Sequence, residues 1–145
     1  MKTNTIELYI HIPFCKSKCR YCDFCSFRAE EETIHAYLGK LKEELIFWGK
    51  KLAARDVVTV FIGGGTPSYL RREDIQMICE TIFEHFHICE DAEITIEANP
   101  GTVDLKKLCT YRENGINRIS FGLQSTVKEE LELSLIHISE PTRPY

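Results

Sequence analysis

The sequence lacks an apolar run long enough to cross a bilayer, so it predicts no membrane-spanning helix. It also lacks a basic excess: 18 lysines and arginines face 22 aspartates and glutamates, a net charge of −4, which argues against a nucleic-acid-binding surface. No signal peptide is recognisable, because residues 1–4 lead straight into a strand-like run. We therefore expect a cytoplasmic protein, and we interpret its seven cysteines as metal-binding or catalytic groups rather than disulfides.

Two kinds of apolar pattern alternate along the chain. Strand-like runs occur at residues 7–12, 57–62, 94–98 and 118–123, and apolar side chains recur at helical spacing in residues 34–52, 75–86 and 104–114. The continuous run at 57–62 is typical of a strand buried on both faces of a parallel sheet. Strand and helix thus alternate three times before a final strand, which predicts an α/β domain with parallel strands.

Cys15, Cys19 and Cys22 form a C-x3-C-x2-C motif directly after the first predicted strand. Three thiolates can bind three irons of a four-iron, four-sulfur cluster and leave the fourth iron open to a substrate. A zinc knuckle is the alternative, but zinc sites usually add a second ligand pair downstream, and the sequence shows no clear one. Cys25 leaves another alternative open, because a fourth cysteine ligand would close the cluster. We favour Cys22 as the last ligand, since the motif is complete without Cys25.

Further candidate residues follow the other predicted strands. The motif Gly-Gly-Gly-Thr-Pro at 63–67 would let a ligand approach the backbone and would expose N–H groups, although a plain tight turn is an alternative. Glu97 ends its strand and can accept hydrogen bonds from a ribose or an amino group. Gln124 either bonds a ligand or faces solvent. Because active sites gather at the carboxyl ends of parallel strands, we expect these groups to lie near the cysteines.

Several motifs also recur in the order and spacing of a known family. They are Tyr-Ile-His-Ile-Pro-Phe-Cys at 9–15, Phe-Ile-Gly-Gly-Gly-Thr-Pro-Ser at 61–68, Ile-Glu-Ala-Asn-Pro-Gly-Thr at 96–102 and Asn-Arg-Ile-Ser-Phe-Gly-Leu-Gln-Ser at 117–125. Over residues 5–126 the sequence resembles the radical S-adenosylmethionine (SAM) enzymes, and within them the group of oxygen-independent coproporphyrinogen III oxidase (HemN) and the heme chaperone HemW. The resemblance implies the N-terminal part of a partial (β/α) barrel with parallel strands.

The resemblance also implies the cofactors and their contacts. Cys15, Cys19 and Cys22 are expected to bind a [4Fe-4S] cluster whose open iron binds SAM. Positions that contact SAM in the oxidase are matched by Tyr9, Gly64, Gly65, Thr66, Glu97 and Gln124. Tyr21 matches a position near a second SAM of the oxidase. From its residue type alone, Tyr9 is equally able to pack on the adenosyl group or to line the core.

Details of the motifs favour the chaperone side of this group. Phe24 stands where the oxidase usually has a further cysteine, and Cys25 comes one residue later. Residues 98–100 read Ala-Asn-Pro where the oxidase usually has an acidic Asp-Pro motif. The implied function is heme binding and delivery to an acceptor protein, with a flavodoxin- or ferredoxin-type reductant. The alternative is an enzyme of porphyrin biosynthesis that decarboxylates coproporphyrinogen III, so enzymatic activity is left open.

The C-terminal segment departs from the βα pattern. Residues 133–145 resemble the translation of a sequencing adapter, and we predict that they are an artefact. Residues 1–132 are then expected to be the N-terminal part of a truncated radical SAM core domain.

Overall fold

The computed structural model describes residues 4–19, 22–125 and 127, so the predicted boundary at residue 132 and the segment after it lie outside the described residues. Its strands and helices are β1 (Thr5–Ile12), α1 (Glu31–Lys51), β2 (Asp56–Gly64), α2 (Arg72–His85), β3 (His87–Ala98), α3 (Leu105–Glu113) and β4 (Arg118–Phe121). Two short 3-10 helices, η1 (Pro67–Tyr69) and η2 (Pro100–Thr102), follow β2 and β3. The predicted alternation of strands and helices is confirmed.

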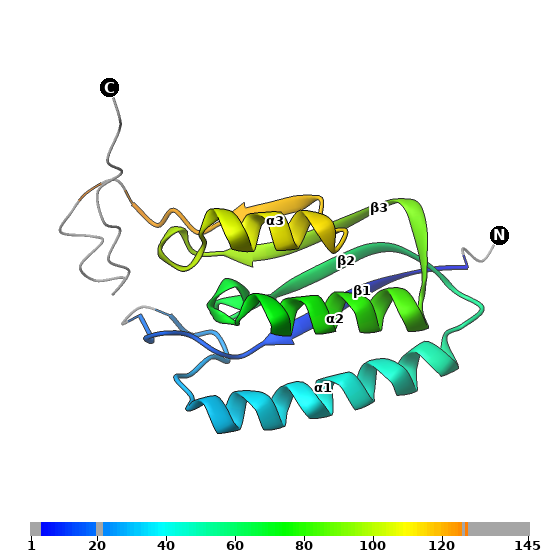
Figure 1. Ribbon diagram of the computed structural model, residues 1–145, viewed down its shortest axis with the longest axis horizontal. Helices are drawn as coiled ribbons and strands as arrows, with labels where there is room; N and C mark the ends of the chain where they lie inside the picture. Colours follow the sequence, from blue (N-terminus) through cyan, green and yellow to red (C-terminus); the bar gives the residue numbers. More distant parts are fainter. Residues whose placement is uncertain (1–3, 20–21, 126, 128–145) are drawn as a thin grey trace.

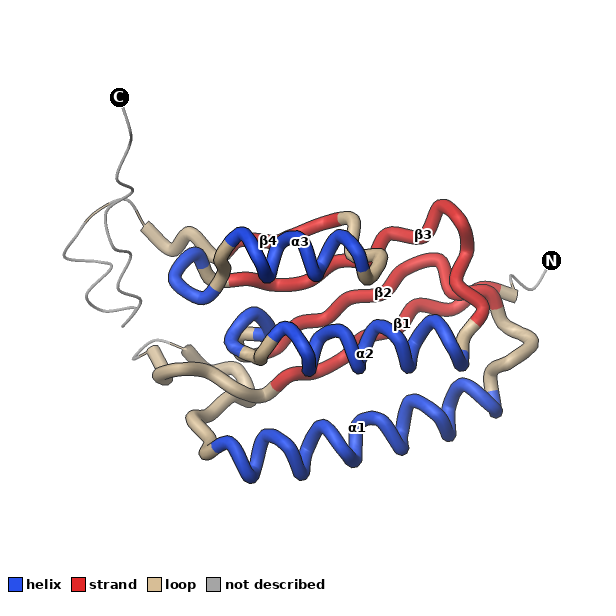
Figure 2. Tube along the Cα trace, in the orientation of Figure 1, coloured by secondary structure: helices blue, strands red, loops and turns tan. Residues whose placement is uncertain are grey.

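The four strands form one parallel sheet in the order β1-β2-β3-β4. All three helices cover the same face of it, as Figure 1 shows and as the tube in Figure 2 repeats. Sequential parallel strands joined by helices on one side are the arrangement from which (β/α) barrels are built. The predicted α/β class with parallel strands is therefore confirmed.

The helices cover one face of the sheet and leave the other face open. Ile62 pairs in register with Ile10 and Ile96, and all three side chains are buried against the helices. Side chains alternate between faces along a strand, so Tyr9 and Phe61 lie on the other face, where Tyr9 is 60% exposed. The prediction that residues 57–62 are buried on both faces is therefore wrong for the open face.

The core lies between the sheet and the helices. Its helical side chains are Leu38, Leu45, Ile75, Ile78, Ile82 and Tyr111, all buried. Burying one large aliphatic side chain stabilises the fold by about 1.5–3 kcal/mol. Trp48, which the helical spacing placed on the apolar stripe, is instead 44% exposed on α1. Gly49 faces α2 in its place, where an added Cβ would lie 2.6 Å from the His85 Cβ.

Element boundaries differ from the sequence prediction by a few residues, and the difference is largest at the start of β3. β3 begins at His87 rather than Ile94, because its first residues pair with the start of β2 before the register shifts between Val57 and Thr59. Acidic residues in this early part of β3 interrupt the apolar run, so the sequence pattern does not indicate a strand there. β4 ends at Phe121, and α3 ends as predicted, with Gly115 at a φ of +84° just beyond it. In the described residues no helix is both long and apolar enough to span a membrane.

Candidate functional site

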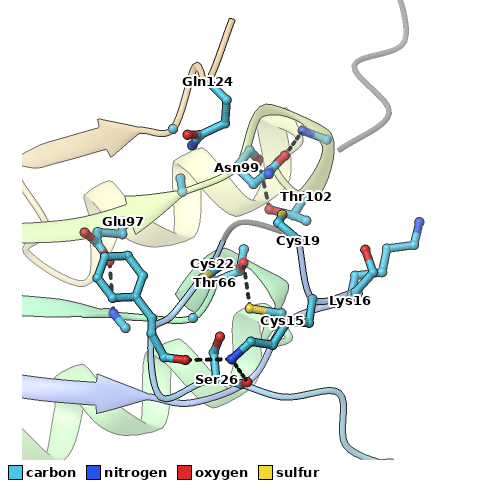
Figure 3. Close-up of a pocket in the computed structure, with 18 of the residues that line it drawn as sticks. Cys15, Lys16, Cys19, Cys22, Ser26, Thr66, Glu97, Asn99, Thr102 and Gln124 are labelled. Carbon is cyan, nitrogen blue, oxygen red and sulfur yellow. Dashed lines mark hydrogen bonds between the residues drawn. The ribbon is translucent and has the colours of Figure 1, made fainter. Parts of the chain in front are cut away.

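One cavity of about 520 Å³ opens at the carboxyl ends of the strands. Figure 3 shows its walls, which come from the loop after β1, the glycine loop after β2, the end of β3 with η2, and the segment after β4. Of the residues predicted from the sequence, the cavity is lined by Cys15, Cys19, Cys22, Gly64, Gly65, Thr66, Glu97 and Gln124. The expectation that the motifs meet at this edge of the sheet is therefore confirmed.

The cysteine loop is closed at its base. Phe14 forms a parallel bridge with Phe27, the Cys15 N–H donates to the Phe27 carbonyl at 3.1 Å, and the Phe27 N–H donates to Pro13 at 2.8 Å. Phe14 is fully buried and meets the rings of Phe27 and Tyr37 edge to face. The core thus holds both ends of the loop and presents its cysteines at the cavity rim.

The three motif cysteines do not converge on one point. Among the residues that the structure describes, no three histidine, cysteine, aspartate or glutamate side chains are placed to hold a single metal ion. Zinc requires all its ligands at about 2–2.3 Å from one centre, whereas each thiolate of a four-iron cluster binds its own iron. Cys15, Cys19 and Cys22 all line one cavity, which is compatible with each thiolate binding its own iron of a cluster.

Cys15 and Cys25 lie in different surroundings. The Thr66 hydroxyl donates to the Cys15 Sγ at 3.5 Å, which links the cysteine loop to the loop after β2. Cys25 is exposed and is not among the residues that line the cavity. Its carbonyl accepts a hydrogen bond from His11 Nε2 at 3.1 Å. This arrangement favours the ligand set that ends at Cys22.

The glycines let three segments approach one another. A Cβ at Gly65 would lie 2.7 Å from the Phe14 carbonyl oxygen and 2.8 Å from the Cys15 Sγ. Gly64 has a φ of +120°, a region that favours glycine, and a Cβ there would meet the His11 ring at 2.8 Å. Any side chain at these two positions would push the cysteine loop away from β2.

The N–H groups of the glycine loop are already bonded within the protein. The Gly64 N–H donates to Glu97 Oε2 at 2.9 Å, and the Gly65 and Thr66 N–H groups donate to the Ile12 and Phe14 carbonyls, both at 2.8 Å. The expectation that this loop exposes N–H groups to a ligand is therefore wrong for these three groups. Their bonds fix the loop against β1 and β3 instead.

Tyr9 lies beside the cavity rather than in its wall. Its hydroxyl is 3.0 Å from His11 Nδ1, its ring stacks on Phe61, and it is not among the lining residues. Since the Cys25 carbonyl can only accept, His11 Nε2 carries a proton, and in a neutral ring Nδ1 then accepts from Tyr9. Partial burial and the charge of Glu97 raise the pKa of Tyr9. The SAM contact of Tyr9 stays a prediction, and Tyr21 lies outside the described residues.

With this geometry in place, the comparisons with known proteins identify the family. Residues 9–144 match the Radical SAM superfamily. The chain belongs to that superfamily. Membership implies a [4Fe-4S] cluster and SAM as cofactors, and the cavity that Cys15, Cys19, Cys22 and Glu97 line offers thiols and a carboxylate.

Curated relatives of this radical SAM chain are heme chaperones. The sequence is 42% identical to the heme chaperone HemW of Escherichia coli K12 over 139 residues, which cover 94% of this chain and 37% of that protein. It is 38% identical to HemW of Bacillus subtilis 168 over 125 residues, which cover 86% of this chain and 33% of that protein. The chain therefore spans about a third of the length of these relatives.

A solved structure confirms the fold class. Coproporphyrinogen III oxidase (HemN) from Escherichia coli, described as a radical SAM enzyme, superposes with a TM-score of 0.85 at 34% sequence identity. The match covers 91% of this chain and 31% of the oxidase chain. The resemblance to the HemN and HemW group is thus confirmed from both sequence and structure.

Two site residues escaped the sequence analysis. Lys18, between two of the cysteines, donates from Nζ to the Phe24 carbonyl at 2.7 Å and to the Ser26 carbonyl at 3.0 Å, and so ties the loop to its returning segment. The Ser26 side chain is buried in the cavity wall, and its Oγ has no hydrogen-bond partner among the described residues. A lysine and a serine beside cysteines look like ordinary surface residues, so no sequence signal marks them.

Proposed function

We propose that this chain is the cluster- and SAM-binding part of a heme chaperone of the HemW type, which binds heme and delivers it to an acceptor protein. The observation that carries the proposal is the 42% identity to the Escherichia coli heme chaperone over 94% of this chain. A cytoplasmic location, a flavodoxin- or ferredoxin-type reductant and a heme-accepting apo-protein belong to the same proposal.

In this proposal some cavity residues bind the cluster and others bind SAM. Cys15, Cys19 and Cys22 would ligate the cluster, and the Thr66 hydroxyl would stabilise the Cys15 thiolate through the bond it already makes. When bound, the cluster supplies an open iron position and one-electron chemistry. Glu97, fixed by the Gly64 N–H, offers a carboxylate to the cationic amino group or the ribose of SAM. Gln124 offers an amide from the segment after β4.

Coproporphyrinogen III oxidase is the second candidate, because the structural match to HemN favours it. Against it stands Phe24, whose side chain is 70% exposed and lines the cavity at the position where the oxidase usually has a cysteine. A closed electron-transfer cluster is the third candidate, and the exposed position of Cys25 outside the cavity wall weighs against it.

The first experiment separates an open cluster from a closed one. The chain is reconstituted with iron and sulfide without oxygen, reduced, and examined by EPR with and without SAM. We expect about four irons per chain and a spectrum that changes on adding SAM, because SAM would bind the open iron. An unchanged spectrum would favour the closed cluster. Cys109→Ala, a change at an exposed cysteine on α3, is the matched control and should behave like the unaltered chain.

The second experiment separates the chaperone from the oxidase. The reconstituted chain is titrated with hemin while its absorption spectrum is followed, and the same preparation is incubated with coproporphyrinogen III, SAM and a reductant. We expect a saturable shift of the hemin absorption and no loss of carboxyl groups by mass spectrometry. Decarboxylated product would instead assign the oxidase. Absence of hemin binding would contradict the proposal that this part of the protein carries heme.

A further inference from the structure

A polar cluster joins the two loops that follow β2 and β3. We call it the loop bridge and define it as Ser68, Asn99, Thr102 and Lys107. Ser68 lies on η1, Asn99 and Thr102 flank and end η2, and Lys107 lies in the first turns of α3. Asn99 and Thr102 line the cavity, whereas Ser68 is fully buried behind it. Neither the sequence motifs nor the cofactor contacts considered above assign a role to Ser68 or Lys107.

Side-chain and main-chain bonds connect Ser68 to the loop after β3. The Ser68 Oγ accepts from the Asn99 N–H at 2.9 Å and is 2.5 Å from the Thr102 Oγ1. The Thr102 hydroxyl also contacts the Asn99 carbonyl at 2.9 Å. A buried hydroxyl with partners on another loop fixes the distance between the two loops.

Lys107 completes the bridge from α3. Its Nζ donates to the Ser68 carbonyl at 2.6 Å and to the Thr102 carbonyl at 3.0 Å, so one ammonium group holds a carbonyl of each loop. Burial lowers the pKa of Lys107 from its usual value. The two carbonyl oxygens take the place of water that the half-buried amino group has lost. The side chain is therefore committed to these bonds rather than to solvent.

We infer that Lys107 is a positioning residue for SAM. It ties η1 to η2, so that Thr66 on one loop and Asn99 on the other face the same cavity at a fixed separation. The inference rests on the proposed binding of SAM in this cavity. A substrate that touches both loops binds well only when their spacing is set before it arrives, because ordering the loops on binding would cost affinity.

The test compares Lys107→Met, Lys107→Arg and Lys106→Met in the reconstituted full chain. Lys106 is the exposed neighbour on α3 and serves as the matched control. We measure iron per chain, the SAM concentration that half-converts the EPR spectrum, and, without cofactors, amide hydrogen exchange in residues 66–68 and 99–102. Lys107→Met should keep its iron, weaken SAM binding about 10- to 100-fold and speed exchange in both loops. Lys107→Arg should recover most of the affinity, and Lys106→Met should match the unaltered chain.

The possible outcomes lead to different conclusions. Equal SAM affinity in Lys107→Met and the unaltered chain would overturn the inference, even if Lys107→Met melted at a lower temperature, because that result would indicate a structural role alone. If SAM does not change the EPR spectrum of the unaltered chain, the proposed function is wrong, and the inference, which rests on it, is wrong as well. Should Lys107→Met not fold, Lys107→Gln tests the same two carbonyl bonds, because it removes the ammonium group and keeps a polar side chain. It should weaken SAM binding by a smaller factor, and unchanged affinity there would also overturn the inference.

Discussion

The helix-covered face of the sheet and its carboxyl edge differ in the kind of side chain they carry and in its exposure to solvent. On the covered face, Ile62 and Ile96 are inaccessible to solvent and belong to the hydrophobic core cluster. At the carboxyl edge, thiols, hydroxyls and a carboxylate surround an open cavity, and Glu97 and Thr66 bond to groups on neighbouring segments. The buried side chains of the covered face stabilise the fold and carry no reactive groups. The polar side chains of the edge can bind cofactors and contribute little to the hydrophobic core. The two regions should therefore respond differently to the same kind of substitution.

A cysteine from each region gives the sharpest contrast. Cys15→Ala should abolish cluster assembly, because a cluster held by two thiolates loses a third of its protein ligands, while the apo chain keeps its stability. Cys79→Ala in the buried core should keep the cluster and lose about 1 kcal/mol of unfolding free energy. Iron content and urea unfolding of both variants measure this. Full cluster content in Cys15→Ala would remove that cysteine from the ligand set.

Two positions that face opposite sides of the sheet, Ile96 on β3 and Tyr9 on β1, test the two faces directly. Ile96→Ala should lower the free energy of unfolding by about 2–5 kcal/mol, because the methyl groups it removes leave a cavity in the core. Tyr9→Ala, on the open face, should cost only about 1 kcal/mol, mainly the stacking on Phe61. Denaturant unfolding of the apo chain compares the two. Equal losses would mean that the open face is as well packed as the covered one.

At the edge, Glu97→Gln keeps the shape of the side chain and removes its charge. We expect SAM to bind about tenfold more weakly, because a charge-assisted bond to the cationic ligand is lost, with little change in stability. The EPR titration with SAM reports the affinity, and the melting temperature of the apo chain reports the stability. Glu90→Gln, a change at an exposed carboxylate near the other end of β3, is the control. A loss of stability without a loss of affinity would assign Glu97 to the fold.

The last effect concerns pH and belongs to the covered face. Burial raises the pKa of the Cys79 thiol to about 12 from an ordinary value of 9.0. The folded chain therefore holds this proton more tightly than the unfolded chain, so the stabilisation is complete below pH 9 and is lost as the pH rises towards 12. By pH 10 the unfolding free energy should fall by about 1 kcal/mol from this group. Cys79→Ala should abolish that slope, as urea unfolding between pH 8 and 10 can show.

Sequence patterns predicted the covered face better than the open one. Apolar periodicity reports burial, so the order of strands and helices and the meeting of motifs at strand ends were both predictable. The start of β3 at His87 was missed because acidic residues there interrupt the pattern although the backbone still pairs with β2. Trp48 was misplaced because a glycine, which carries no apolar signal, makes the close contact with α2.

Within the site, the ligands were predictable and their supports were not. Cysteines at fixed spacing carry a chemical signature, so Cys15, Cys19 and Cys22 stood out from the sequence alone. Lys18 and Lys107 donate hydrogen bonds to main-chain carbonyls. Because every residue has such a carbonyl, the amino-acid sequence does not indicate which ones they bond. The N–H groups of the glycine loop illustrate the same limit, because only the folded structure shows that β1 and β3 already bond them.

The closed base of the cysteine loop bears on how the protein recovers from damage. Oxygen destroys exposed iron–sulfur clusters, and a loop released at both ends would have to find its geometry again each time. Here the bridge between Phe14 and Phe27 is made by backbone pairing and by an edge-to-face contact of the buried Phe14 ring with the partly exposed Phe27 ring, and it does not depend on iron. The entropy of closing the loop is therefore spent during folding rather than at each repair. A chain that has lost its cluster therefore keeps the ends of its cysteine loop paired, so a new cluster can assemble on a loop that is already closed.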